Sequence, residues 1–444
     1  MRETATLSGI RSKRQANSKR LFDPPAQRDC VRLTNIYATP WHLPEDADHA
    51  LPGEYLRLGR LEEYFNGSAA QLPKVIQRID LDHDQIAFRR WDRLRALTGA
   101  RLWLLVVPSR QIVGVLSLDV SCELAHTIDL LEDCYYLDVK VGDQSITTLA
   151  AEALGMEGVF LPERHQIAFG PKMSAAKCDD IVQRVIYRSD LPYRKEFSAI
   201  TYPVELNRRP EAVAAVGPYV SVLGGQQDYV ENTVFLSAVQ GVASAARLRE
   251  IRAAAYSAVS TFRAGDRTHQ GTQMRRKTLE SLSGKLGNME LDLSYSVEAT
   301  ADLGLLVPSL RVVGYHDALY EAMGLVAKAE TVARMLRRLE RATAAELTAI
   351  ESQERRADED RRLRWTVAIG FVSTVAVPVG LILAFLGINA REVDSSWSMF
   401  DTRYLPVYAL AVVILLIGAL VSAALYAQQR RAMRRNGRSQ DPAE

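Results

Sequence analysis

The residues with the clearest chemical potential are Gly387, Ile388 and Asn389, which lie between two long apolar stretches. Glycine can end a helix without strain at Cβ, and this leaves backbone carbonyls and the Asn389 amide at the negative end of the helix dipole. A ring of neutral oxygens can hydrogen-bond the water shell of Mg²⁺, an ion that gives up its waters reluctantly. The tripeptide therefore indicates either a selectivity mouth for hydrated divalent cations or a plain helix C-cap followed by a turn.

Side chains that precede the tripeptide recur at helical spacing and could line a conduit. This predicted pore-lining face consists of Thr366, Ile369, Ser373, Val377, Gly380 and Ala384. The face is small or weakly polar, and Ile369 and Val377 would form apolar rings that can gate by dewetting. Small residues also allow close helix packing, which is the alternative interpretation of Gly380 and Ala384.

Three acidic side chains, Glu351, Glu354 and Asp358, recur at steps of three and four residues. Repeated around a symmetric axis, they would attract cations toward the inner end of a pore. The interleaved Arg355 and Arg356 favour the other interpretation, a solvated helix face with internal ion pairs.

Residues 80–84, Asp-Leu-Asp-His-Asp, are of the types that bind hard metal ions. They lack the glycine and the distal glutamate of a calcium loop, so a surface turn is the alternative to a regulatory cation site.

Two charge-free apolar stretches, 365–386 and 404–426, must position the tripeptide. About 20 apolar residues at a rise of about 1.5 Å span a hydrocarbon core of about 30 Å. Trp365, Tyr404 and Tyr426 stand at the ends of the stretches, where aromatic side chains favour the membrane interface. We therefore expect a pore-lining first transmembrane helix, an outer loop at 387–403 and a second transmembrane helix.

Arginines define the expected orientation. Arg361, Arg362 and Arg364 precede the first stretch, and a further arginine cluster lies within 427–444. The positive-inside rule then places both termini in the cytoplasm and the loop outside the inner membrane, with 427–444 as a basic cytoplasmic tail. Residues 1–30 are basic without a long apolar run, which predicts a mobile tail rather than a secretory signal.

A long stalk helix is expected over 309–364. Its apolar stripe recurs at steps of three and four and consists of Leu336, Leu339, Thr343, Leu347 and Ile350. Continued to residue 386, the helix would be about 115 Å long. Such a helix needs partner helices.

Residues 31–265 are expected to form a cytoplasmic α/β or α+β domain, followed by a helical connection at 266–308. Apolar runs on either side of Pro108-Ser-Arg110 predict a hairpin of 101–107 with 111–119. Further strands are expected at 158–161, 166–169 and 200–206, and helices at 145–154, 176–187, 235–262 and 279–303.

The composition is that of an ordinary folded protein. The formal net charge is +2, with 24% charged and 48% hydrophobic residues, which argues against a nucleic-acid-wrapping chain. Four dispersed cysteines indicate packed thiols rather than a disulfide scaffold. No phosphate-binding glycine loop, nucleophile elbow or HExxH motif is present, so we expect neither an enzyme nor a cofactor other than the divalent cation itself.

The layout resembles the CorA family of divalent-cation channels. Over about 200–430, a long helix leads into the first of two C-terminal spans, and Pro378 precedes Gly387 by nine residues. The family signature is Gly-Met-Asn, and Ile388 replaces its methionine. The resemblance implies a homopentameric funnel in the lipid bilayer, in which each first span lines the pore and each second span faces lipid.

Two other functions remain open. Gly-Ile-Asn occurs in branches of the family that include ZntB-like zinc transporters, and residues 390–400 lack the acidic Met-Pro-Glu-Leu type of element of the typical outer loop. The protein would then transport zinc, either with or without coupling to protons. The large region before the stalk instead suggests a membrane-tethered signalling or defence effector whose spans act as an anchor or a ligand-gated leak.

Overall fold

The computed structural model describes residues 30–44, 54–55, 73–170, 178–189, 191, 194, 198–267, 272–298 and 310–377, with separate positions at 380, 384, 402 and between 405 and 427. The chain divides into two compact units, Met1–Thr343 and Ala344–Glu444. A sheet with flanking helices, followed by long helices, gives the mixed α/β content that the sequence predicts.

The first unit is built on an eight-stranded sheet of order β10-β11-β9-β1-β6-β5-β3-β2. Among the described pairs, β11 and β9 run parallel and the others antiparallel. A second sheet has the order β4-β7-β8. The strands are β1 (Val31–His42), β2 (Glu54–Tyr55), β3 (Lys74–Asp80), β4 (Ile86–Phe88), β5 (Leu97–Val106), β6 (Gln111–Val120), β7 (Val139–Val141), β8 (Gln144–Ser145), β9 (Arg164–Gly170), β10 (Val213–Val216) and β11 (Val220–Gly224).

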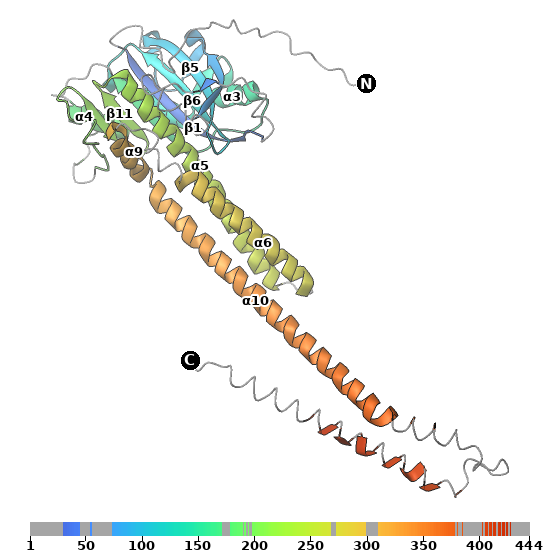
Figure 1. Ribbon diagram of the computed structural model, residues 1–444. Coiled ribbons are helices and arrows are strands. Elements are labelled where there is room, and N and C mark those ends of the chain that lie inside the picture. The colour runs from blue at the N-terminus through green and yellow to red at the C-terminus, as the bar shows by residue number, and fades with distance from the viewer. Residues whose placement is uncertain are drawn as a thin grey trace, which may run out of the picture. The chain divides into compact units, whose positions relative to one another are not determined.

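Helices cover both faces of the large sheet. Strand residues alternate between two buried clusters, so that Ile36 of β1 packs toward α5 (Asp228–Arg267) and α9 (Leu310–Ala322). Its neighbour Tyr37 packs toward α2 (Ile128–Tyr136), α3 (Ile146–Leu154) and α4 (Cys178–Tyr187). Figure 1 shows α5 lying across the sheet. Because both faces are covered, β1, β6 and β9 are buried at nearly every position, and their buried polar side chains find partners within the sheet, as Gln166 does by donating to Asn35 Oδ1 at 2.7 Å.

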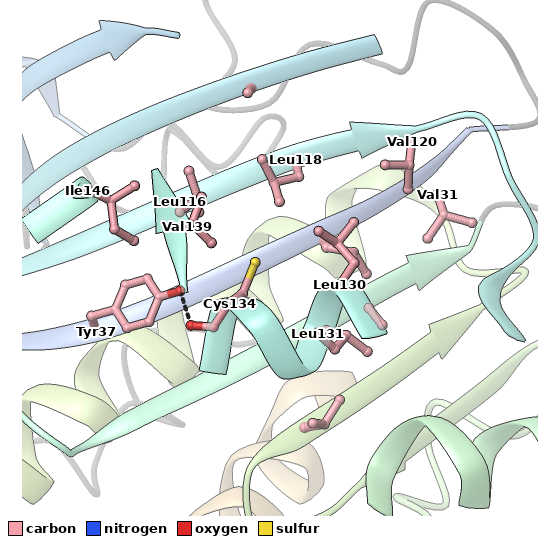
Figure 2. Close-up of a cluster of buried hydrophobic side chains, with 14 of the residues drawn as sticks. Val31, Tyr37, Leu116, Leu118, Val120, Leu130, Leu131, Cys134, Val139 and Ile146 are labelled. Carbon is pink, nitrogen blue, oxygen red and sulfur yellow. Dashed lines mark hydrogen bonds between the residues drawn. The ribbon is translucent and has the colours of Figure 1, made fainter. Parts of the chain in front are cut away.

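The apolar cluster between the sheet and α2 contains one hydrogen bond that links β1 to α2. Figure 2 shows Tyr37 of β1 among aliphatic side chains of β1, β6 and α2, with its hydroxyl donating to the Cys134 carbonyl at 2.7 Å. Burial raises the pKa of Tyr37 well above its ordinary value, with the Cys134 thiol adding to the increase. Cys30 and Cys134 are buried free thiols, which agrees with the packed cysteines that the sequence predicts.

The expected hairpin and three of the expected helices are confirmed. β5 and β6 pair across the turn that contains Arg110, whose φ is 66° and whose N–H bonds to the Val107 carbonyl. α3 begins after Ser145, whose hydroxyl accepts from the Thr148 N–H at 3.1 Å. α4 and α5 cover the ranges predicted at 176–187 and 235–262 within their described bounds.

Two expected strands are wrong. Residues 158–161 lie beside β1 as irregular chain, since Gly158 has φ 128° and the Phe160 ring stacks on Tyr37 at 5.1 Å. Residues 200–206 form only an isolated bridge between Thr201 and Val216 and then a turn. Pro203 has no N–H to give to a ladder, and the Asn207 side chain takes over the backbone partners, donating to the Pro203 carbonyl at 2.7 Å.

The long helices form a bundle within the first unit. The second half of α5, α6 (Thr272–Leu293) and the beginning of α10 (Leu325–Phe371) share an apolar cluster. Leu336 and Leu339, from the stripe predicted on the stalk, are buried in it. The described residues also contain short helical segments of other types. Three are 3₁₀ helices, η4 (His83–Gln85), η5 (Leu94–Ala96) and η6 (Leu124–Thr127), and two are π-helical, η9 (Ser294–Glu298) and η10 (Val372–Ala376).

The stalk is not the single helix from residue 309 that the sequence predicts. α9 ends before Gly324, which has φ 65°, and α10 begins at the next residue. The Gly324 N–H bonds to the Glu321 carbonyl, and Lys328 donates to the Met323 carbonyl at 2.8 Å. Glycine takes the left-handed conformation at little cost, so it closes α9 where other residues would be strained.

Candidate functional site

The predicted selectivity mouth lies outside the described residues. This holds for Gly387, Ile388 and Asn389, for Pro378 and for the loop at 387–401. The mouth therefore stays a prediction from the sequence.

The predicted pore-lining residues lie in described helical positions. Thr366 and Ile369 belong to α10, Ser373 to η10, and Val377, Gly380 and Ala384 are helical positions beyond it. The Thr366 hydroxyl donates to the Arg362 carbonyl at 2.9 Å. The π turn of η10 winds more widely than an α turn, so it rotates the later positions relative to Thr366 and Ile369, and π turns are frequent at functional sites.

Large apolar side chains are exposed throughout the described part of both expected spans. Every described position in 365–386 and 404–426 is helical. Exposed apolar surface on this scale marks a surface that contacts lipid or protein. The exposed residues are Trp365, Ile369, Val372, Val377, Leu405, Tyr408, Leu410, Val412, Val413, Leu416, Ile417, Leu420 and Val421.

Within the part of the chain that the structure describes, no helix has both the length and the hydropathy needed to cross a membrane.

The three predicted cation-attracting residues lie on α10. Glu351 and Asp358 are exposed, and Glu354 is partly buried. Their spacing places them along one side of the helix. Arg355 and Arg356 are exposed on the same segment, so positive and negative side chains alternate there.

Residues 80–84 form a surface turn. Asp80 contacts Arg78 at 3.2 Å and Arg101 at 3.5 Å, and Asp82 caps η4 by accepting from the Asp84 N–H at 3.2 Å. The described residues contain no group of three or more His, Cys, Asp or Glu side chains that could hold a metal ion.

An ion-pair network that no local sequence pattern indicates lies between the sheet and α5. Arg32 of β1 is 3% exposed and contacts Asp119 of β6 at 2.8 Å and Glu231 of α5 at 3.2 Å. A buried guanidinium needs such partners because desolvation of an unpaired charge is costly. The network fixes the start of α5 against the middle of the sheet.

A second buried chain of polar groups joins the sheet to α9. His165 Nε2 of β9 lies 2.8 Å from Ser221 Oγ of β11, and the Tyr315 hydroxyl of α9 donates to the same oxygen at 2.8 Å. All three residues are fully buried. Burial lowers the pKa of His165 to about 3, against a backbone hydrogen bond at Pro218 that raises it.

This His–Ser pair is not arranged for nucleophilic catalysis. A general base must accept a proton near the working pH and must reach a substrate. His165 stays neutral until about pH 3, and Ser221 has no exposed surface. The hydrogen bonds among His165, Ser221 and Tyr315 therefore connect β9 and β11 to α9 and hold that helix in place.

Comparison with known proteins gives no match, whether with family models, with curated proteins or with solved structures.

Proposed function

We propose that the chain is a divalent metal cation channel or transporter of the CorA type, which passes hydrated Mg²⁺ or a related ion through a homo-oligomeric pore. The observation that carries the proposal is that the described positions of two apolar stretches, 365–386 and 404–426, are helical and include many exposed apolar side chains. The Gly387–Asn389 tripeptide lies between these stretches in the sequence. Exposed apolar helices of this kind are stable when lipid or neighbouring copies cover them.

Oligomerisation follows from the size of the proposed membrane part. Two helices cannot enclose an aqueous path, because in lipid their outer surfaces must be apolar and their backbone groups are used within each helix. Several copies are needed so that the first spans surround a pore. The CorA resemblance supplies the number five and the funnel shape.

α10 gives the proposed pore a connection to the sheet unit. It continues without a break from Leu325, in the bundle with α5 and α6, to Phe371 within the first proposed span. Ile369, a proposed gating position, and Leu336, a bundle position, therefore belong to one helix.

Asn389 provides the sharpest test. The full chain is reconstituted into liposomes, and uptake of Mg²⁺, Co²⁺, Ni²⁺ and Zn²⁺ is followed with enclosed indicators. We expect Asn389→Ala to reduce uptake at least tenfold, because the ring of amide oxygens that holds the hydrated ion is lost. Assembly should be unchanged.

Asn288→Ala is the matched control, since Asn288 is an exposed amide on α6 outside the proposed pore. Its uptake should equal that of the unaltered protein. Undiminished uptake by Asn389→Ala would contradict the mouth assignment.

Zinc transport is the second candidate, favoured by Ile388 and by a loop without the typical acidic element. The same liposomes distinguish it when ions compete across an imposed pH gradient. Preference for Zn²⁺ with gradient-driven uptake supports a ZntB-like transporter, whereas gradient-independent Mg²⁺ uptake supports the channel. A protein that conducts only when a cytosolic ligand is added would instead be the tethered effector.

A further inference from the structure

A half-open groove runs between α5 and α6, in the bundle of long helices. The two helices pack against each other through a shared apolar cluster, and Figure 1 shows α6 alongside the second half of α5. Side chains from 254–261 of α5 and from 274–289 of α6 line the groove, which has a volume of about 470 Å³. We call this site the α5–α6 groove. Its volume falls in the range of about 300 to 1,000 Å³ that is typical of small-molecule sites.

The floor of the α5–α6 groove is apolar. Ala258 and Leu282 belong to the buried cluster of the bundle, and Met289 packs against that cluster. Met274, the first lining position of α6, is 60% exposed, so part of the apolar lining is uncovered. Methionine side chains adapt to varied apolar partners because they are unbranched and polarizable. The floor therefore favours a flexible hydrocarbon ligand.

The groove is elongated along the helices. Its lining positions on α6 recur at steps of three and four from Met274 to Met289, over a length of about 22 Å at the helical rise. The lining hydroxyls of Thr261 and Thr278 donate within their own helices, to the carbonyls of Ser257 at 3.0 Å and Met274 at 2.9 Å. These hydroxyl protons therefore need no acceptor from a ligand. An extended chain suits such a site better than a compact polar molecule.

Two lysines give the groove a positive charge. Lys277 and Lys285 line it from α6, about 12 Å apart along the helix, and both are exposed. Among the described residues that line the groove, none is acidic and none is an arginine. Glu280, which lies between the two lysines in the sequence, pairs instead with Arg276 at 2.8 Å. Arginine is the side chain that holds phosphate through paired hydrogen bonds, whereas lysine offers a point charge, so the groove favours a single carboxylate.

We propose that the α5–α6 groove binds a free long-chain carboxylate, the anion of a fatty acid, with its hydrocarbon chain on the apolar floor and its carboxylate at Lys277 or Lys285. Contact with the chain removes the uncovered apolar lining from water, which is favourable. A free fatty acid has one chain and one negative charge, whereas a membrane phospholipid has two chains and a phosphate. The site lies within the first unit and uses none of the proposed pore residues.

The test uses the full chain in lipid nanodiscs and a photoactivatable hexadecanoic acid with a diazirine on its chain. Cross-linked peptides are mapped by mass spectrometry, which separates labelling of α5 and α6 from labelling of the apolar stretches by probe dissolved in the lipid. The methyl ester of the probe has the same chain without the charge. We expect the acid to label the groove peptides at least tenfold more than the ester. Equal labelling by both would overturn the anion, and no labelling of these peptides would overturn the site.

The double variant Lys277→Gln with Lys285→Gln tests the positive charge. It should reduce labelling of the groove peptides by the acid at least tenfold, because no ammonium group remains for the carboxylate. Lys140→Gln is the matched control, since Lys140 is an exposed lysine on β7 outside the groove. It should leave this labelling unchanged. Undiminished labelling of the double variant would contradict the proposal.

Ser281→Trp tests the groove as a space. Ser281 is exposed and lines the groove, so an indole at this position fills it without entering the buried cluster. Labelling by the acid should fall at least tenfold at an unchanged melting temperature. Ser283→Trp places the same side chain at an exposed position of α6 that does not line the groove, and it should label like the unaltered protein. Equal labelling of the two variants would show that the probe binds elsewhere.

Two further measurements distinguish other occupants. Labelling of the groove by a phosphatidylglycerol with the same diazirine chain, in preference to the acid, would show a membrane lipid there and contradict the free carboxylate. Chemical cross-links from Lys277 to a second copy, in place of labelling by the acid, would show a contact between copies and also contradict it. Because these measurements need no ion flux, failure of the pore proposal and failure of this one are separate results.

Discussion

At the scale of single residues, burial decides what polar groups can do in this protein. His165 and Ser221 form a pair whose distance would suit chemistry, yet complete burial removes access and lowers the pKa of the imidazole to about 3. Burial also raises the pKa of Tyr315, which favours the protonated hydroxyl that donates to Ser221. The hydrogen bonds of His165 and Tyr315 to Ser221 thus serve to fasten α9 to the sheet.

The buried imidazole predicts acid sensitivity. An unfolded His165 takes up a proton near its ordinary pKa of 6.5, whereas the folded one stays neutral until about pH 3. The stability it contributes is complete above pH 6.5 and is lost as pH falls from 6.5 to 3, at up to about 1.4 kcal/mol per pH unit. Urea unfolding at a series of pH values measures this slope.

Two variants isolate the contribution of His165. A glutamine at position 165 can still hydrogen-bond Ser221 and does not titrate. In His165→Gln the slope of the unfolding free energy against pH, between pH 6.5 and 3, should therefore decrease by about 1.4 kcal/mol per pH unit, the contribution of one proton. His126→Gln, which removes an exposed histidine, is the control for the loss of an imidazole. An unchanged slope in His165→Gln would show that another group causes the acid sensitivity.

The partners of these residues could not be predicted from the sequence. His165 and Ser221 are 56 positions apart, and Ser221 and Tyr315 are 94 apart. Short-range spacing carries no information about contacts that the sheet order creates. The same holds for Arg188 and Tyr135, which become neighbours only when α4 and α2 pack on the same face of the sheet. Glycine, proline and asparagine at 378–389 are recognisable because they are close in the sequence.

At the scale of elements, short sequence patterns predict those helices, strands and turns that depend on neighbouring residues alone. The β5–β6 hairpin follows from two apolar runs with a short polar turn between them, and α3 follows from its serine cap. The segment 200–206 has the same apolar character as a strand, but Pro203 and the Asn207 side chain divert its backbone bonds. The break in the stalk depends on one positive φ at Gly324, which apolar periodicity does not reveal.

Gly324→Ala tests the break between α9 and α10. An added Cβ would meet only Lys328 Cε at 3.7 Å, so the cost comes from the backbone at φ 65° and should be about 1 kcal/mol of destabilisation. Gly287→Ala in α6 is the matched control, because its Cβ would meet nothing within 4 Å. It should stabilise by up to about 1 kcal/mol through helix propensity. Urea unfolding gives both values, and equal signs would contradict the assigned role of Gly324.

At the scale of the whole molecule, the described parts of the two units differ in how far their apolar side chains are covered. Helices bury both faces of the large sheet, whereas the apolar side chains described between Trp365 and Val421 are mostly exposed. In the proposed assembly, lipid and other copies of the chain would cover this surface. The proposed pore rests on this surface together with the Gly-x-Asn tripeptide.

The most direct test of this account is the mass of the intact particle, measured by native mass spectrometry of the full chain released from detergent micelles. We expect an assembly of five times the 49.4 kDa chain mass. The assembly of the Asn389→Ala variant should have the same mass, apart from the small change of the substitution itself. A particle with the mass of one chain would contradict the account, because a single pair of spans has no interior through which a hydrated ion can pass.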